Sequence, residues 1–240
     1  MNYLAHLHLA EPTPESCLGN LLGDFVKGYP WDDRYPEAVW RGIVEHRFVD
    51  AYTDRHPRWK RSREILPVEL RRFAGIVVDI YYDYFLHRHW DRFSPEEKLE
   101  AFVERVTGDL WTARDLAPPV ARGAIGKMIK QGWLYEYASL DGIDRTLVRV
   151  RSRAPYLEPV FAASGRLRDR LPELEEDFLA FYPDLIAYVE AMRDGCGMGV
   201  PPMRRVRART ADGSSRPVSG PFPAADAKPG DAGPKPCDSP

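Results

Sequence analysis

Residues 68–90 constrain the fold of this chain more than any other segment. Wound as a helix, the segment is apolar on nearly every side, whereas a helix at the surface of a globular protein is apolar along one stripe only. We therefore expect a central helix surrounded by the other elements.

Helix start and stop signals flank this segment on both sides. Thr13 as N-cap, Pro14 at the first helical position and Gly28 as terminator predict one helix. Ser94 and Glu97 have the spacing of a capping box, which predicts the start of another. Strand signals are nearly absent, and "MNYLAHLHL" alternates only weakly and is also compatible with a helix. Further helical patterns cover residues 36–56, 118–138, 142–153, 156–170 and 172–193. The chain is predicted to be all-α.

Composition changes near residue 199 of the 240. Residues 201–240 hold nine prolines and four glycines but no Leu, Ile, Trp or Tyr, so they cannot bury enough carbon to offset the entropy of ordering. We predict one helical domain over residues 1–198 and a disordered Pro/Gly-rich tail over residues 199–240.

Charge, cysteines and the amino-terminal segment narrow the protein class. The formal net charge is −2, which argues against a nucleic-acid binder. Three scattered cysteines without a CxxC motif fit a reducing compartment. No signal peptide and no apolar run long enough for a membrane span is present. We expect a cytoplasmic protein that does not act at a membrane.

Two helical stripes carry acids and imidazoles where carbon is expected. His46 and Asp50 lie on the stripe that Val39 and Ile43 mark as inward. In the central segment, Asp79, Asp83 and His87 share a second stripe at i, i+4 and i+8, too long for one ion to bind all three. Asp24 lies at the edge of the first helix's apolar face, and His6 lies near the start.

Buried carboxylates are costly unless paired, hydrogen-bonded or bound to a metal. Arg47 could supply the positive charge, and so could a divalent cation. Mixed nitrogen and oxygen donors suit Mn²⁺, Fe²⁺ or Mg²⁺ better than structural zinc, which prefers thiolates. From the pattern alone, a shared metal site and separate satisfied core polar groups remain open.

Four ordered motifs carry a family resemblance. "MNYLAH", "GNLLGDFVKG", "HRFVDAYTDRHP" and "DIYYDYFLHRHW" resemble those of the acyl carrier protein phosphodiesterase family, which is similar to a divergent, rearranged form of the all-α HD phosphohydrolases. The resemblance covers about residues 1–195. It implies an HD-like helical fold and Mn²⁺-dependent removal of 4′-phosphopantetheine from the serine of holo-acyl carrier protein.

The resemblance also implies roles for individual residues. Asp24 is the strongest catalytic candidate and a metal ligand, His6 is an extra ligand or acid, and Arg47 or Lys27 would offset phosphate charge. The chain departs from the ordinary HD pattern because Arg47, not an aspartate, follows His46. The implied metal ligands are Asp24, His46, Asp50, Asp79 and Asp83, and His87 is assigned to substrate binding.

The basic stretch 58–72 is a second candidate surface. Arg61, Arg63 and Arg72 would attract an acidic protein, and acyl carrier proteins are strongly acidic with their modified serine at the start of an acidic helix. Two alternatives stay open: an HD-type hydrolase of a nucleotide or another small phosphoester, and a non-catalytic helical protein that binds acyl carrier protein.

Overall fold

A computed structural model describes residues 2–28, 34–153 and 167–195. Its regular elements are all helices over those ranges, so the predicted all-α class is confirmed. None of the helices in that part of the chain is long and apolar enough to cross a membrane. The chain divides into a unit of residues 1–189 and a unit of residues 190–240, and the fold described below is that of the first unit.

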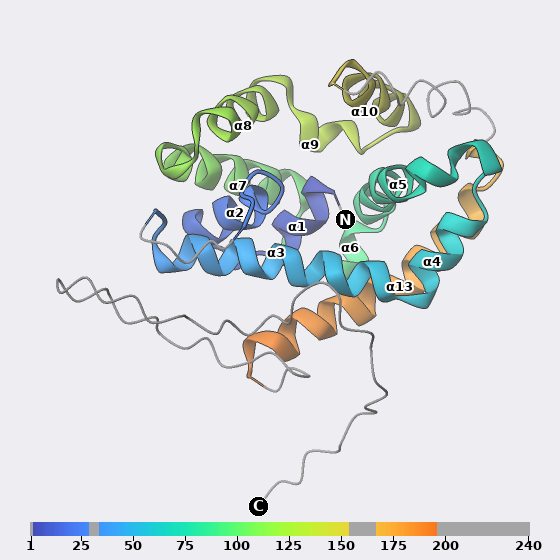
Figure 1. The fold of residues 1–240 in the computed structure, drawn as a ribbon, viewed down its shortest axis with the longest axis horizontal. Coiled ribbons are helices and arrows are strands. Elements are labelled where there is room, and N and C mark those ends of the chain that lie inside the picture. Colours follow the sequence, from blue (N-terminus) through green and yellow to red (C-terminus); the bar gives the residue numbers. More distant parts are fainter. Residues whose placement is uncertain (1, 29–33, 154–166, 196–240) are drawn as a thin grey trace, which may run out of the picture. The chain divides into compact units, whose positions relative to one another are not determined.

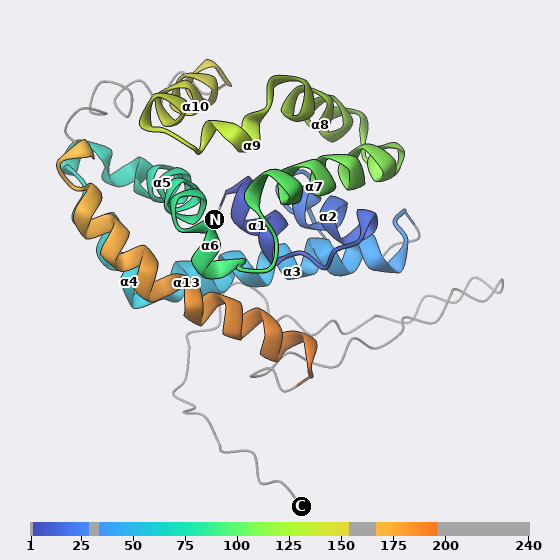
Figure 2. The same ribbon diagram turned by 180° about the vertical axis from the view of Figure 1, so that it is seen from behind.

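Three helices form the amino-terminal layer: α1 (Tyr3–Leu9), α2 (Pro14–Leu22) and α3 (Glu37–Arg55). As predicted, Thr13 caps α2, because its hydroxyl accepts a hydrogen bond from the Ser16 amide at 3.2 Å. The helix ends at Leu22 rather than running to Gly28. In Figures 1 and 2, α1 and α2 lie along one side of the long helix α3.

The apolar segment 68–90 folds as a short 3₁₀ turn, η1 (Val68–Phe73), followed by α5 (Ala74–Arg88). Helix α4 (Pro57–Glu64) precedes it and α6 (Trp90–Phe93) follows it. Val77, Tyr81 and Phe85 are at most 1% exposed, and α5 packs against α1, α4 and α10 (Leu140–Arg153). The expected central helix is therefore present, although it begins at Ala74.

The remaining described helices are α7 (Leu99–Ala113), η2 (Arg114–Leu116), α8 (Pro119–Gln131), α9 (Trp133–Glu136) and α13 (Leu171–Arg193). The prediction of a single helix over 118–138 was wrong: Gly132, with φ of 63°, ends α8 before α9 begins. The predicted capping box was also wrong. Lys98 precedes α7, and the Glu97 carboxylate instead binds the Arg105 guanidinium at 2.8 and 2.9 Å.

Two predictions concern segments outside the described residues. Most of the helix predicted over 156–170 falls in residues 154–166, and the predicted disordered tail, 199–240, lies wholly beyond residue 195. The domain boundary at residue 198 stays a prediction.

Candidate metal and active site

The site is built where α2 and α3 cross at very short distance. A Cβ atom at Gly19 would lie 2.3 Å from the carbonyl oxygen of Val39 and 2.8 Å from the Cα of Gly42. Only a residue without a side chain fits there, so the two helix backbones approach closely. This approach brings the last turn of α2 within reach of side chains on the middle of α3.

The side chain of His46, on α3, contacts the last turn of α2. Its Nδ1 lies 2.7 Å from the carbonyl oxygen of Asn20, one of the last four carbonyls of α2, which have no partner in the helix backbone. A carbonyl only accepts hydrogen bonds, so Nδ1 carries the hydrogen. Nε2 of His46 is therefore the atom left to face the other groups of the site.

Gly23 and Asp24 pass directly over this ring. A Cβ at Gly23 would lie 2.1 Å from Cδ2 of His46, so the chain can turn there only with glycine. The turn brings Asp24 Oδ1 to 3.5 Å from His46 Nε2. One helical turn further along α3, Asp50 Oδ2 lies 3.1 Å from the same nitrogen.

His6 enters the site from α1. Its ring stacks on that of His46, with centroids 3.8 Å apart and planes at 17°, and its Nε2 lies 3.2 Å from Asp50 Oδ1. Although His6 is only 3% exposed, neither of its ring nitrogens makes an aligned hydrogen bond with any described residue. Asp50 thus faces two imidazole nitrogens, one with each carboxylate oxygen.

The charges of the group depend on one another. Burial alone would lower the pKa of His46, but the carboxylates of Asp24 and Asp50 outweigh it and raise that pKa to about 9. Burial and the charge on His46 lower the pKa of His6 to about 4. Although burial opposes it, the two histidines lower the pKa of Asp50, and His46 lowers that of Asp24. In the absence of a metal, a proton on His46 therefore stabilises the carboxylates of Asp24 and Asp50.

The donor set also fits a divalent cation. One ligand atom each from His6, His46 and Asp50 lies within 4.8 Å of the others. Nε2 of His46 is oriented by its Nδ1 hydrogen bond to a carbonyl, as is usual for metal-binding histidines. The ring nitrogens of His6 are buried and make no aligned hydrogen bond with the described residues, so they are atoms that a cation would satisfy. Two imidazoles, one carboxylate and no thiolate are typical of sites for Mn²⁺ or Fe²⁺ with further positions left open.

Asp79, Asp83 and His87 were predicted to share a stripe, but the structure does not bring them into this donor set. The two oxygens of Asp83 accept the backbone N–H groups of Leu4 and Ala5 at 2.8 and 3.1 Å, at the start of α1. Asp83 thus anchors the helix that carries His6. Asp79 Oδ1 accepts the indole N–H of Trp59 at 3.2 Å.

Arg47, on α3, contacts the loop that follows Asp24, and Lys27 belongs to that loop. The guanidinium of Arg47 donates to the carbonyl oxygens of Val26 and Gly28 at 2.6 and 2.7 Å. Arg47 therefore holds the loop against α3, which is a different task from the predicted contact with phosphate. Lys27 is exposed on the same loop.

The three arginines predicted to bind the partner have different surroundings. Arg61 donates to Asp177 of α13 at 2.9 Å. Arg63 lies over the ring of Trp59, 4.7 Å from its centroid, and Arg72 lies over Phe73 at 4.5 Å. Arg63 and Arg72 are exposed, so these two remain accessible to a partner.

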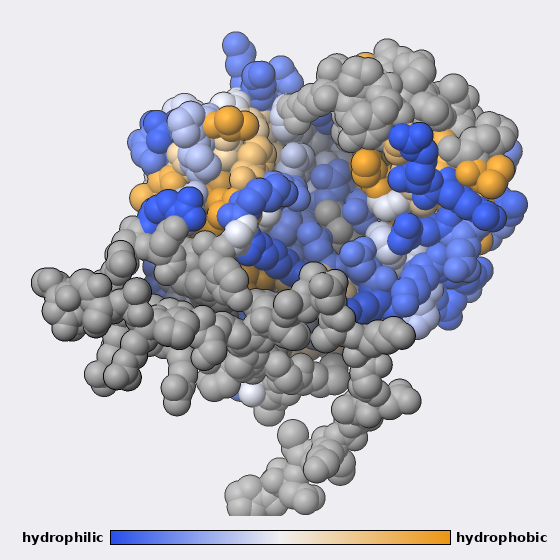
Figure 3. Space-filling model, viewed as in Figure 1, coloured by the Kyte–Doolittle hydropathy of each residue, from blue (hydrophilic) through white to orange (hydrophobic). Residues whose placement is uncertain are grey.

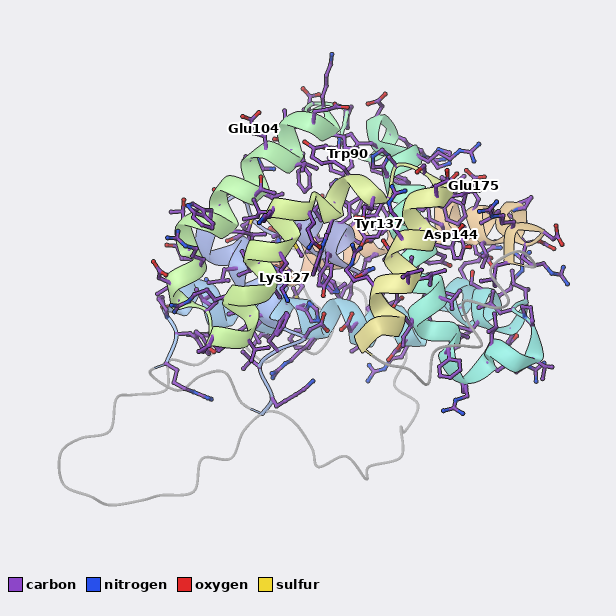
Figure 4. The ribbon with its side chains drawn as sticks, turned by 90° about the horizontal axis from the view of Figure 1, so that it is seen from above. Trp90, Glu104, Lys127, Tyr137, Asp144 and Glu175 are labelled. Atoms are coloured by element: carbon purple, nitrogen blue, oxygen red, sulfur yellow. The ribbon has the colours of Figure 1, made fainter. Side chains whose placement is uncertain are left out.

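Figure 3, in the view of Figure 1, shows hydrophilic residues around a hollow beside the amino-terminal end of α1. At that end, Asn2 Nδ2 donates to the hydroxyl of Tyr137 at 3.0 Å. Tyr137 follows α9 and lies among the helices in Figure 4. The start of α1 is thus held by Asp83 on one side and by Tyr137 on another.

The sequence predicted that His46, Asp50 and Asp24 lie together, with His6 as an additional ligand or acid, and the structure brings His6 into the donor set with His46 and Asp50. One contribution was missed. The carbonyl of Asn20 was not foreseen. Its only sequence signal was an asparagine inside the apolar pattern of the first helix.

Comparison with known proteins gives one consistent result. The sequence model of the family described as acyl carrier protein phosphodiesterase matches residues 1–185. The chain is 38% identical over 186 residues to the protein of that name from Serratia proteamaculans (strain 568), covering 78% of this chain and 96% of that protein. It is 38% identical over 187 residues to the one from Salmonella agona (strain SL483), with the same coverage. No solved structure matches the chain.

Proposed function

Since this chain belongs to the acyl carrier protein phosphodiesterase family, we propose that it hydrolyses the phosphodiester that joins 4′-phosphopantetheine to the serine of holo-acyl carrier protein. The observation that carries the proposal is the meeting of His6, His46 and Asp50 beside Asp24. This is a polar, partly exposed group able to hold a divalent ion next to the carboxylate of Asp24.

We further propose that His6, His46 and Asp50 hold Mn²⁺, with Mg²⁺ or Fe²⁺ as substitutes. When bound, such an ion neutralises charge on a phosphate oxygen and lowers the pKa of a bound water. Asp24, whose side chain is 58% exposed, is the fourth candidate ligand. In this proposal, Asp79 and Asp83 support the site from α5 instead of binding the ion.

The other steps of the reaction are assigned to side chains of the protein. The low pKa of Asp24 keeps its carboxylate ionised, so that it accepts a hydrogen bond from the attacking water and orients it. Lys27, exposed on the loop held by Arg47, offsets charge on the phosphate. His6 has a pKa of about 4 and is therefore neutral at pH 7. It is consequently a poor proton donor to the leaving serine, which favours the ligand role for it.

The acidic carrier protein would dock beside this site on Arg63 and Arg72. Trp59 lies under Arg63, and its indole N–H donates a hydrogen bond to Asp79. Burial raises the pKa of the Asp79 carboxyl, and the charge of Asp50 raises it to a lesser degree. Asp79 thus contacts the Trp59 side chain beneath Arg63 and lies within electrostatic reach of Asp50. We place this reaction in the cytoplasm, where carrier proteins act.

The direct test is intact-mass analysis of holo-acyl carrier protein after incubation with the protein and Mn²⁺. Conversion to the apo form is expected, and both chelator and the His46→Ala variant should prevent it. Release of p-nitrophenol from bis(p-nitrophenyl) phosphate without any conversion of the carrier protein would instead favour the small-phosphoester alternative. Binding of the carrier protein without conversion would favour the non-catalytic one.

A further inference from the structure

The side chains of Asn20 and Glu45 form a buried polar contact directly behind His46. Asn20 is fully buried and Glu45 is 8% exposed. The amide nitrogen of Asn20 donates to Oε1 of Glu45 at 3.1 Å and to the carbonyl oxygen of Ser16 at 3.2 Å. One amide group therefore ties the backbone of α2 to the residue that precedes His46 on α3.

This contact is not explained by core packing. The second amide atom, Oδ1 of Asn20, is buried without a hydrogen-bond partner among the described residues. An unpaired buried acceptor lowers stability, and an apolar residue would avoid that loss. Asparagine is also a weak helix former. Residues that break local rules in this way are expected where function sets the geometry.

Its position explains what the contact does. The backbone carbonyl of the same Asn20 accepts the Nδ1–H of His46 at 2.7 Å. A tilt of α2 relative to α3 would lengthen this bond, allow the imidazole to rotate and turn Nε2 away from Asp50. The Asn20–Glu45 contact opposes such a tilt at the level of His46, whereas Gly42, one turn earlier on α3, meets the backbone of α2 at Gly19 and Asn20.

We propose that Asn20 and Glu45 are a positioning pair, which holds the end of α2 on α3 so that the Asn20 carbonyl fixes the ring orientation of His46. Neither side chain touches the substrate or the ion. The inference rests on the proposed function for its consequence, the metal affinity, but the hydrogen bond itself can be observed in the metal-free protein.

The experiment compares Asn20→Ala and Glu45→Ala with Ser62→Ala in the full chain. Ser62 is a matched control, because it is also fully buried, and its hydroxyl lies 2.9 Å from that of Tyr82 and 3.1 Å from Asp177, away from His46. In ¹⁵N-histidine-labelled protein with chelator, the Nδ1–H of His46 should give a slowly exchanging resonance, assigned by its absence in His46→Gln. Mn²⁺ affinity is then measured by electron paramagnetic resonance.

Asn20→Ala and Glu45→Ala should each lose the protected resonance and weaken Mn²⁺ binding about 10- to 100-fold. The double variant should lose little more than either single variant, since the two side chains act as one unit. Glu45→Gln, which keeps the acceptor oxygen, should retain both properties, as should Ser62→Ala. The glutamine variant also decides the matter if the alanine variants fail to fold: loss of the resonance in that variant overturns the proposal.

Persistence of the His46 resonance in Asn20→Ala, with only a lower Tm, would show that the pair is merely structural. The resonance does not depend on catalysis. If the wild-type protein leaves holo-acyl carrier protein intact while the variants lose the resonance, the proposed function fails and the positioning role stands.

Discussion

Two of the clusters with buried charged groups in the described part of the chain are built in opposite ways. The arginine–aspartate cluster consists of Arg58, Arg61, Ser62 and Asp177, and it joins α4 to α13. The histidine–aspartate cluster consists of His6, Asp24, His46 and Asp50, and it joins α1, α2 and α3.

In the arginine–aspartate cluster the chain supplies its own permanent cations. Asp177 is fully buried and accepts from Arg61, Ser62 and Arg58 at 2.9, 3.1 and 3.4 Å. A guanidinium does not lose its proton at any ordinary pH, so this cluster needs nothing from outside. It stabilises the contact between two helices.

In the histidine–aspartate cluster, by contrast, the Asp50 carboxylate lies 3.2 and 3.1 Å from imidazole nitrogens of His6 and His46. Their positive charge is a proton that a metal can replace. The difference teaches that a carboxylate held by guanidinium groups serves stability, whereas one held by an imidazole proton can exchange that proton for a metal ion. The same isosteric substitution made in both clusters tests this distinction.

The largest expected effect is that of Asp50→Asn on hydrolysis. The amide keeps the shape but loses the charge that holds a cation, so turnover of holo-acyl carrier protein should fall by about 10³-fold or more. The Tm should change by only a few degrees, because Asp50 is 42% exposed in its side chain. Turnover is followed by intact mass; unchanged turnover would remove Asp50 from the site.

Asp177→Asn should lower stability and leave turnover unchanged, which is the reverse of the effect expected for Asp50→Asn. It leaves Arg58 and Arg61 facing an amide at a fully buried position, which should lower the free energy of unfolding by about 2–4 kcal/mol. Turnover by the folded protein should be unchanged. Urea unfolding measures the first quantity and intact mass the second. A loss of activity at full stability would contradict the division of roles.

Mn²⁺ should stabilise the wild-type protein and the Asp177→Asn variant but not Asp50→Asn. At a free concentration 100-fold above Kd, the gain is about 2.7 kcal/mol, or about 5–10 °C in Tm for a domain of this size. Differential scanning calorimetry with Mn²⁺ and with chelator gives the shift. An equal shift in Asp50→Asn would place the ion elsewhere.

This stabilisation by Mn²⁺ should depend on pH. The pKa of His46 in the metal-free fold, about 9, lies above its ordinary value of 6.5. The proton on His46 therefore stabilises the metal-free fold fully below pH 6.5, and this contribution is lost as pH rises through 9. Because Mn²⁺ must displace that proton, the increase in Tm caused by Mn²⁺ should grow between pH 6.5 and 9.

The smallest expected effect concerns docking. Arg61 belongs to the arginine–aspartate cluster, so its reversal would disturb stability, whereas Arg63 and Arg72 are exposed. Arg63→Glu with Arg72→Glu should raise KM for holo-acyl carrier protein several-fold at low salt and less at high salt. Hydrolysis of bis(p-nitrophenyl) phosphate should stay the same; an equal loss for both substrates would mean that these arginines are structural.

Much of this arrangement could be predicted, because helices and their inward stripes are local properties of the sequence. Periodicity placed His46 and Asp50 on one inward stripe of a helix over 36–56, and both lie in α3. It could not say what packs against a stripe. Asp83 was therefore assigned to a metal, whereas its carboxylate accepts hydrogen bonds from the first backbone N–H groups of α1. The stacking of His6 on His46 and the Asn20 carbonyl likewise depend on contacts between distant segments.

The anchoring of α1 by Asp83 has a consequence for the order in which the site forms during synthesis. A helix of seven residues is too short to persist alone in water. His6 therefore has no fixed position on the nascent chain when residues 1–50 first leave the ribosome, although every member of the donor set has then been made. The cation site appears only after the chain has grown past residue 83 and α5 has folded onto α1. An unfinished chain, or one whose α5 is damaged, consequently has no preformed site with which to capture metal.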